Sequence, residues 1–120
     1  GANTDSEAAE LPAIGRVIGT MADYAVITCG RTGEHGSHRA CLEIRMGFSD
    51  LTKLQLILDR QEAIQWALNE CQEGDAVVIV GMGTEPHTPR GSEGALANDS
   101  EIVREALRSE PITIPFRLAA

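Results

Sequence analysis

The chain has 120 residues, of which 42% are hydrophobic and 3% are aromatic. This length and composition predict one folded domain with an aliphatic core and are not typical of a disordered chain. The formal net charge is -8, and the single lysine and the scattered arginines form no basic cluster. The composition therefore argues against a nucleic-acid surface, and no apolar run is long enough for insertion into a membrane.

The three cysteines form no C-x-x-C pair and predict reduced thiols in a cytoplasmic protein. Cys29, His35, His38 and Cys41 follow the spacing C-x5-H-x2-H-x2-C, and thiolates and imidazoles are zinc ligands. Cys29 is expected to end a buried strand and Cys41 to face the core from the next helix, so the four ligands would have to converge from different elements. We therefore expect no metal site, and we interpret the histidines as a surface pair.

Residues 1–10 are expected to form a loose lead-in. A helix follows, because apolar residues recur with helical spacing at Ile14, Val17, Ile18, Met21 and Ala22. Pro12 suits the first turn of this helix. The apolar run 25–29 predicts a buried strand. Ser37 is expected to cap a second helix, which Gly47 ends.

The run 54–58 predicts another strand. Asp59 and Glu62 resemble a capping box and open the clearest helix of the chain. The apolar face of this helix consists of Ala63, Ile64, Ala67, Leu68 and Cys71. Trp66 lies near the same face, where packing is its expected role. The run 76–80 then predicts a further buried strand.

Residues 82–98 are rich in glycine and proline and predict a loop. Asn98 and Glu101 resemble a second cap that opens the last helix, and the tail 111–120 holds a possible edge strand. Helices thus alternate with apolar strands. This order predicts an α/β fold with a mostly parallel sheet and helices on both faces.

Two glycine-containing loops follow predicted strands, at residues 29–33 and 81–85. Ligands of open α/β sheets bind outside the carboxyl ends of the strands, so both loops are expected to border one crevice. Glu85 is the strongest single candidate, because a carboxylate there can hold an ammonium group or transfer a proton. The alternative is a solvated loop acid. Pro86 stands where the dinucleotide fingerprint has its third glycine, and the chain has no G-x-x-x-x-G-K-[ST] loop for ATP.

Three segments resemble motifs of the Mur ligase family in the same order. LPAIGRVIGTMADYAVIT (11–28) resembles KRPxMGxIAxxxADxVIVT, and DRQEAIQWALNECQEGDAVVIVGMGTE (59–85) resembles DRxEAIxxALxxAxxGDxVLIAGKGHE. NDSEIVREAL (98–107) resembles DDREVAREAL. The middle match is the most specific, and the tripeptide synthetases are the most similar branch of the family.

The resemblance implies a Rossmann-like domain, the third of the three domains of these enzymes, spanning residues 1–120 and beginning just after the domain's usual first strand. The family uses ATP to add an amino acid to a UDP-N-acetylmuramoyl-peptide in peptidoglycan biosynthesis, a step of cell wall biogenesis that supports cell shape and cell division. The precursor is activated as an acyl phosphate, which the amine of the amino acid attacks. ATP and Mg2+ are bound mainly by a central domain, which is absent from this chain and is its expected partner. The fragment alone is therefore expected to bind no cofactor and to be inactive.

In the tripeptide synthetases the glutamate of GKGHE, with the backbone beside it, holds the far end of the incoming amino acid. No catalytic residue is implied. The ungapped alignment puts the family's DNPR motif on residues 30–33, and a gapped alignment puts its arginine on Arg31, whose guanidinium could bind a carboxylate. The implied amino-acid contacts are Arg31, Gly81, Gly83, Thr84 and Glu85. Gly30 and Asp99 are possible further contacts, although Asp99 also suits a helix cap.

The departures from the family pattern leave alternatives open. Met82 and Thr84 replace the lysine and the histidine of GKGHE, and DNPR is missing in the ungapped alignment. The resemblance therefore does not imply specificity for diaminopimelate. One alternative is a degenerate, non-catalytic binding or regulatory module. Another is a ligase of the folylpolyglutamate or cyanophycin synthetase type, although those enzymes as a rule lack the G-x-G-x-E ending.

Overall fold

The computed structural model describes residues 10–28, 35–81 and 98–109. The elements, in chain order, are α1 (Glu10–Met21), β1 (Ala25–Ile27), α2 (His35–Met46), the 3-10 turn η1 (Leu51–Lys53), β2 (Leu54–Leu56), α3 (Arg60–Glu70) and α4 (Asp99–Ser109). The possible edge strand at 111–120 lies outside the described residues. In the described ranges, no helix has the length and apolar character that crossing a bilayer requires.

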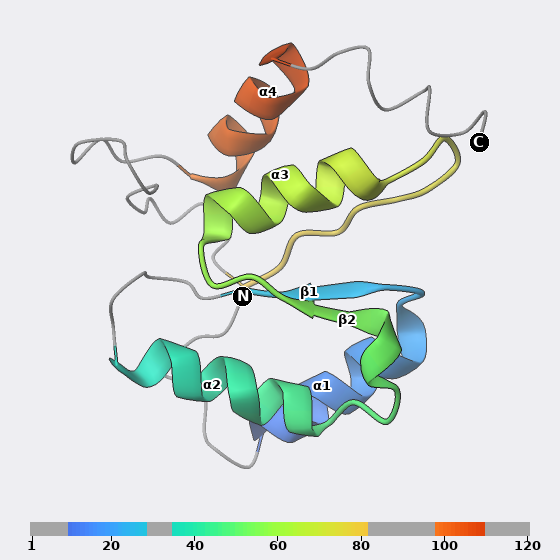
Figure 1. Cartoon of the computed structure of the whole chain (residues 1–120), viewed down its shortest axis with the longest axis vertical. Helices are drawn as coiled ribbons and strands as arrows, with labels where there is room; N and C mark the ends of the chain where they lie inside the picture. The colour runs from blue at the N-terminus through green and yellow to red at the C-terminus, as the bar shows by residue number, and fades with distance from the viewer. Residues whose placement is uncertain (1–9, 29–34, 82–97, 110–120) are drawn as a thin grey trace.

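The two strands form a parallel pair in which Val26 lies opposite Gln55. Figure 1 shows α1 and α2 on one face of this pair and α3 and α4 on the other. β1 contacts both α2 and α3 and is therefore covered from both sides. The described residues thus confirm the α/β fold with parallel strands and helices on both faces.

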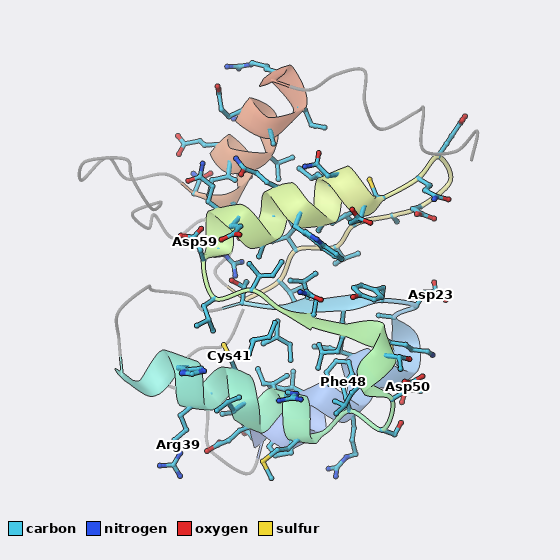
Figure 2. The ribbon with its side chains drawn as sticks, in the orientation of Figure 1. Asp23, Arg39, Cys41, Phe48, Asp50 and Asp59 are labelled. Atoms are coloured by element: carbon cyan, nitrogen blue, oxygen red, sulfur yellow. The ribbon has the colours of Figure 1, made fainter. Side chains whose placement is uncertain are left out.

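The main core lies between the sheet and the layer formed by α1 and α2. Its buried residues are Leu11, Ile27, Ala40, Cys41, Ile44 and Phe48. Cys41 is completely buried, which confirms that this thiol packs in the core. Figure 2 shows Cys41 on the sheet side of α2 and Arg39 on the opposite side. Burial of such apolar surface, at roughly 25 cal/mol per Å2, is the main force that holds this layer on the sheet.

The layer formed by α3 and α4 buries fewer apolar residues. Ala63 and Ile64 of α3 and Ile102 of α4 are buried. Trp66 is half-buried, and its ring centroid lies 5.6 Å from that of Tyr24. The predicted packing role of Trp66 is confirmed by this contact, which joins α3 to the residue just before β1.

The helix predicted around residues 14–22 is confirmed, but the face predicted to be buried is only partly correct. Leu11 and Gly15 are buried, whereas Ile14, Val17 and Met21 are 39%, 57% and 80% exposed. The reason is that small residues, and not the largest apolar ones, decide which side of α1 approaches α2.

The close approach of α1 and α2 depends on Gly15 and Gly47. A Cβ atom on Gly15 would collide with the carbonyl oxygen of Ile44, and one on Gly47 would collide with that of Pro12. Each glycine thus faces the backbone of the other segment. Gly47 also follows directly on Met46, the last residue of α2, as predicted, and its N–H donates to Ile44 O at 3.0 Å.

The start of α2 differs from the prediction. The helix begins at His35, so Ser37 lies inside its first turn and not at the cap. A helix end can shift by one or two residues at little cost, so a capping residue near the end does not fix the first residue.

The predicted start of α3 is confirmed. The Asp59 carboxylate accepts a hydrogen bond from the N–H of Glu62 at 2.9 Å. Asp50 caps η1 in the same way, through the N–H and the hydroxyl of Thr52. The Thr52 hydroxyl is the main cause that holds the pKa of Asp50 below its ordinary value.

The buried strand predicted at 76–80 is wrong. These residues form no strand, and Val78 and Val80 are 79% and 56% exposed. A strand requires a neighbour that pairs with its N–H and C=O groups, and β1 and β2 pair only with each other in the described part of the chain. Figure 1 shows the segment returning along α3 toward the start of that helix. An apolar run predicts a preference for burial but supplies no pairing partner.

Replacement of Gly15 by alanine is expected to lower the free energy of unfolding by about 1–3 kcal/mol, because the new methyl group forces the two backbones apart. The measurement is urea unfolding followed by Trp66 fluorescence. Alanine is otherwise favoured over glycine inside a helix, so an unchanged or higher stability would contradict the close approach. Thr20→Ala, at an exposed position of the same helix, is the control and is expected to change stability by less than about 0.5 kcal/mol.

Candidate functional site

The carboxyl ends of β1 and β2 are joined at one edge of the sheet. The Ile57 N–H donates to Ile27 O at 3.0 Å, one step beyond the paired strands. The Thr28 hydroxyl then donates to Leu58 O at 3.2 Å. Thr28 is the last described residue before the first predicted site loop, so the start of that loop is fixed against the end of β2.

The residue that follows the cap of α3 extends this connection across the molecule. Arg60 Nε donates to Asp99 Oδ1 at 2.7 Å, and Arg60 Nη2 donates to Asp99 Oδ2 at 2.6 Å. Nη2 also donates to Val80 O at 3.3 Å. One guanidinium therefore contacts the start of α4 and the end of segment 76–80, where the second predicted site loop begins.

The start of α4 is itself well defined. The Asn98 side chain accepts a hydrogen bond from the N–H of Glu101 at 3.0 Å, and the Glu101 carboxylate accepts one from the N–H of Asn98 at 2.9 Å. This reciprocal pair is the predicted capping box. Asp99 lies in the first turn, where the positive end of the helix dipole also favours its negative charge.

Four polar or charged residues are buried in the described part of the chain, and all of them lie at this edge. They are Thr28, Asp59, Arg60 and Asp99, each less than 9% exposed. Burial of charged groups is costly unless they are paired and hydrogen-bonded, so this network requires the partners described above. Thr28 lies directly before the first predicted site loop, and the partners of Arg60 lie on either side of the stretch that holds the second.

The predicted site residues fall into two groups. Gly81 is exposed and has a φ of 113°, a left-handed conformation that favours glycine. Asp99 is buried with both carboxylate oxygens bonded to Arg60, and its role as an amino-acid contact stays a prediction. The remaining candidates lie outside the described residues and also stay predictions: Gly30, Arg31, Gly83, Thr84 and Glu85.

The possible zinc spacing receives no support from its described members. His38 is exposed and Cys41 is completely buried, so these two side chains face different surroundings. Cys29 lies outside the described residues. No group of three or more histidine, cysteine, aspartate and glutamate side chains within the described ranges could hold a metal ion.

Sequence reasoning missed Arg60 as a functional candidate. Its signal was present, because Arg60 lies in the motif DRQEAI and its partner Asp99 lies in NDSEIV, the second and third segments of the family resemblance. An arginine directly after a helix cap requires a carboxylate partner if it is buried. Neither segment alone shows that the two side chains meet.

Comparison with curated proteins finds several relatives that share one name. The UDP-N-acetylmuramoyl-L-alanyl-D-glutamate–2,6-diaminopimelate ligase of Alkaliphilus metalliredigens is 29% identical over 111 residues, which are 92% of this chain and 22% of that enzyme. The enzymes of the same name from Synechocystis sp. and Nostoc sp. are 31% and 30% identical over 107 residues, 89% of this chain. The chain thus spans about a fifth of the length of these relatives. No family model matches the chain.

Removal of one partner of the buried ion pair is expected to destabilise the fold strongly. Arg60→Met leaves the Asp99 carboxylate buried without its counter-charge, which costs about 3–5 kcal/mol. Urea unfolding measures the loss. The double variant Arg60→Met/Asp99→Leu is expected to recover much of the lost stability, because no unpaired charge remains.

Arg39→Met is the matched control. Arg39 forms an ion pair with Glu43 at 2.9 Å, but its side chain is 83% exposed. Such a pair contributes about 0–1 kcal/mol, so the control variant is expected to remain near the stability of the unsubstituted chain. A loss as small at Arg60 as at Arg39 would show that the buried pair is dispensable.

Proposed function

Since the chain belongs to the Mur ligase family, we propose that it is the C-terminal, amino-acid-binding domain of an ATP-dependent ligase. The whole protein would add an amino acid to a UDP-N-acetylmuramoyl-peptide during peptidoglycan biosynthesis. The observation that carries the proposal is similarity to such ligases over about nine-tenths of the chain. The buried polar network at the carboxyl edge of the sheet supports it further, because this edge is where the proposed amino-acid site begins.

The proposed task of this domain is to hold the amino acid and present its amine to the activated carboxyl group of the precursor. Arg31 and Glu85 would contact the charged groups of the amino acid, and Gly81 and Gly83 would let the backbone approach it closely. Closure of the domain over the rest of the protein would exclude water from a reactive intermediate. Such a closing motion requires that the loops start from fixed points, and the network at Thr28 and Arg60 supplies them.

ATP and Mg2+ are assigned to the rest of the whole protein. The chain carries no phosphate-binding G-x-x-x-x-G-K-[ST] loop, and its described residues contain no cluster of metal-binding side chains. When bound, the nucleotide and its metal supply the phosphoryl group that activates the precursor. In our proposal they are held mainly by the central domain of the whole protein.

Ligation by the whole protein tests the proposal. The assay combines ATP, Mg2+, UDP-N-acetylmuramoyl-dipeptide and one amino acid at a time, drawn from diaminopimelate, lysine, ornithine and smaller amino acids. We expect one of them to give a ligated product with stoichiometric release of ADP. Because Met82 and Thr84 depart from the family pattern, the preferred amino acid is open. Absence of product with every amino acid would favour the non-catalytic alternative.

Glu85→Ala in the whole protein is expected to raise the KM for the amino acid more than about tenfold, because a lost charge-assisted contact is worth roughly 1.5–3 kcal/mol. The KM values for ATP and for the precursor are expected to stay the same. Steady-state kinetics with each substrate varied in turn provide the measurement. Glu73→Ala, which removes an exposed carboxylate from the turn after α3, is the control. Equal kinetics in both variants would remove Glu85 from the site.

A further inference from the structure

We propose that Arg60 is a positioning residue for the amino-acid site, because its guanidinium holds both ends of the segment that carries Gly83, Thr84 and Glu85. Arg60 Nη2 donates to Val80 O at 3.3 Å, directly before Gly81. The same guanidinium binds the Asp99 carboxylate, at the point where the chain enters α4. The inference rests on the proposed function for its kinetic test, but its structural test is independent of that function.

The position of the Arg60 guanidinium is fixed by its surroundings. Its backbone lies in the first turn of α3, directly after Asp59, which caps that helix. Its side chain is 3% exposed and shares two short hydrogen bonds with Asp99. The planar fork of an arginine allows only one orientation when two of its nitrogens bind one carboxylate, so the contact with Val80 O is directed as well.

The contact with Arg60 joins segment 76–80 to the start of α3. The segment forms no ladder with β1 or β2, and Val78 is largely exposed, so neither sheet hydrogen bonds nor burial of this side chain set the position of its end. Gly81 then turns the chain with a φ of 113°. A shift of Val80 would therefore move Gly81, after which the residues of the proposed amino-acid site follow in the sequence.

The same side chain also contacts the other end of this stretch. Residues 82–97 separate Gly81 from Asn98, and Asp99 is the first residue of α4. α4 packs against α3, and the ion pair between Arg60 and Asp99 joins the first turns of the two helices. A displaced guanidinium would therefore affect both ends of the stretch together.

Arg60→Lys in the whole protein provides the test, because lysine keeps the charge but lacks the fork. We expect the KM for the amino acid to rise at least about fivefold, and the KM values for ATP and the precursor to change less than about twofold, since only one substrate is bound by the displaced stretch. Arg39→Lys, the same substitution in the exposed pair with Glu43, is expected to leave all three values unchanged.

Gly15→Ala is the control that separates an effect on the position of the site from a general loss of stability. This variant is expected to weaken the layer formed by α1 and α2, and the partners of Arg60, Asp99 and Val80, lie outside that layer. We expect it to lower the midpoint of unfolding without raising the KM for the amino acid. The proposal is overturned if Arg60→Lys raises all three KM values equally or leaves them all unchanged. It is also overturned if Arg60→Lys, like Gly15→Ala, lowers only the midpoint of unfolding.

Hydrogen exchange measured by mass spectrometry gives the structural test on the same variants. In Arg60→Lys a peptide covering residues 79–85 is expected to exchange at least about threefold faster, because the contact with Val80 is lost and this segment opens more often. A peptide from the middle of α3 is expected to exchange at an unchanged rate. Unchanged exchange at 79–85 would overturn the proposal. If the unsubstituted protein ligates no amino acid, the proposed function fails and exchange alone decides on Arg60.

Discussion

The buried ion pair between Arg60 and Asp99 is the interaction on which the arrangement of the site edge depends. Each partner opens a helix, and the two residues lie 39 positions apart in the chain. A charged pair in an apolar interior contributes little net stability compared with apolar residues of similar size, but it is costly to break. In this fold the pair joins the first turns of α3 and α4, and the same guanidinium binds the carbonyl group of Val80.

The two layers of the fold are held by different forces. On one side α1 and α2 pack through glycines and aliphatic side chains, and every buried residue of this cluster is apolar. On the other side α3 and α4 bury few apolar residues and depend on capping groups and on the ion pair. This division agrees with our proposal that the amino-acid site lies beside the layer formed by α3 and α4.

Local patterns in the sequence predicted most of the fold. The caps at Asp59 and Asn98 were recognisable because each places an acceptor three residues before a free N–H group. The strand predicted at 76–80 failed because pairing depends on a neighbour that no local pattern describes. Arg60 was missed for a related reason: its partner lies in another segment, and burial of a charged residue becomes visible only when both segments are in place.

The glycine contact between α1 and α2 divides the surface of α1 into two sides with opposite tolerance to substitution. On the inner side, even one added methyl group meets backbone atoms that have no room to move. On the outer side Val17 and Met21 are large, apolar and mostly exposed. Polar residues at these two positions would reduce the exposed apolar surface without disturbing the contact between the two helices. These are therefore the positions to substitute when a more soluble preparation of the chain is needed.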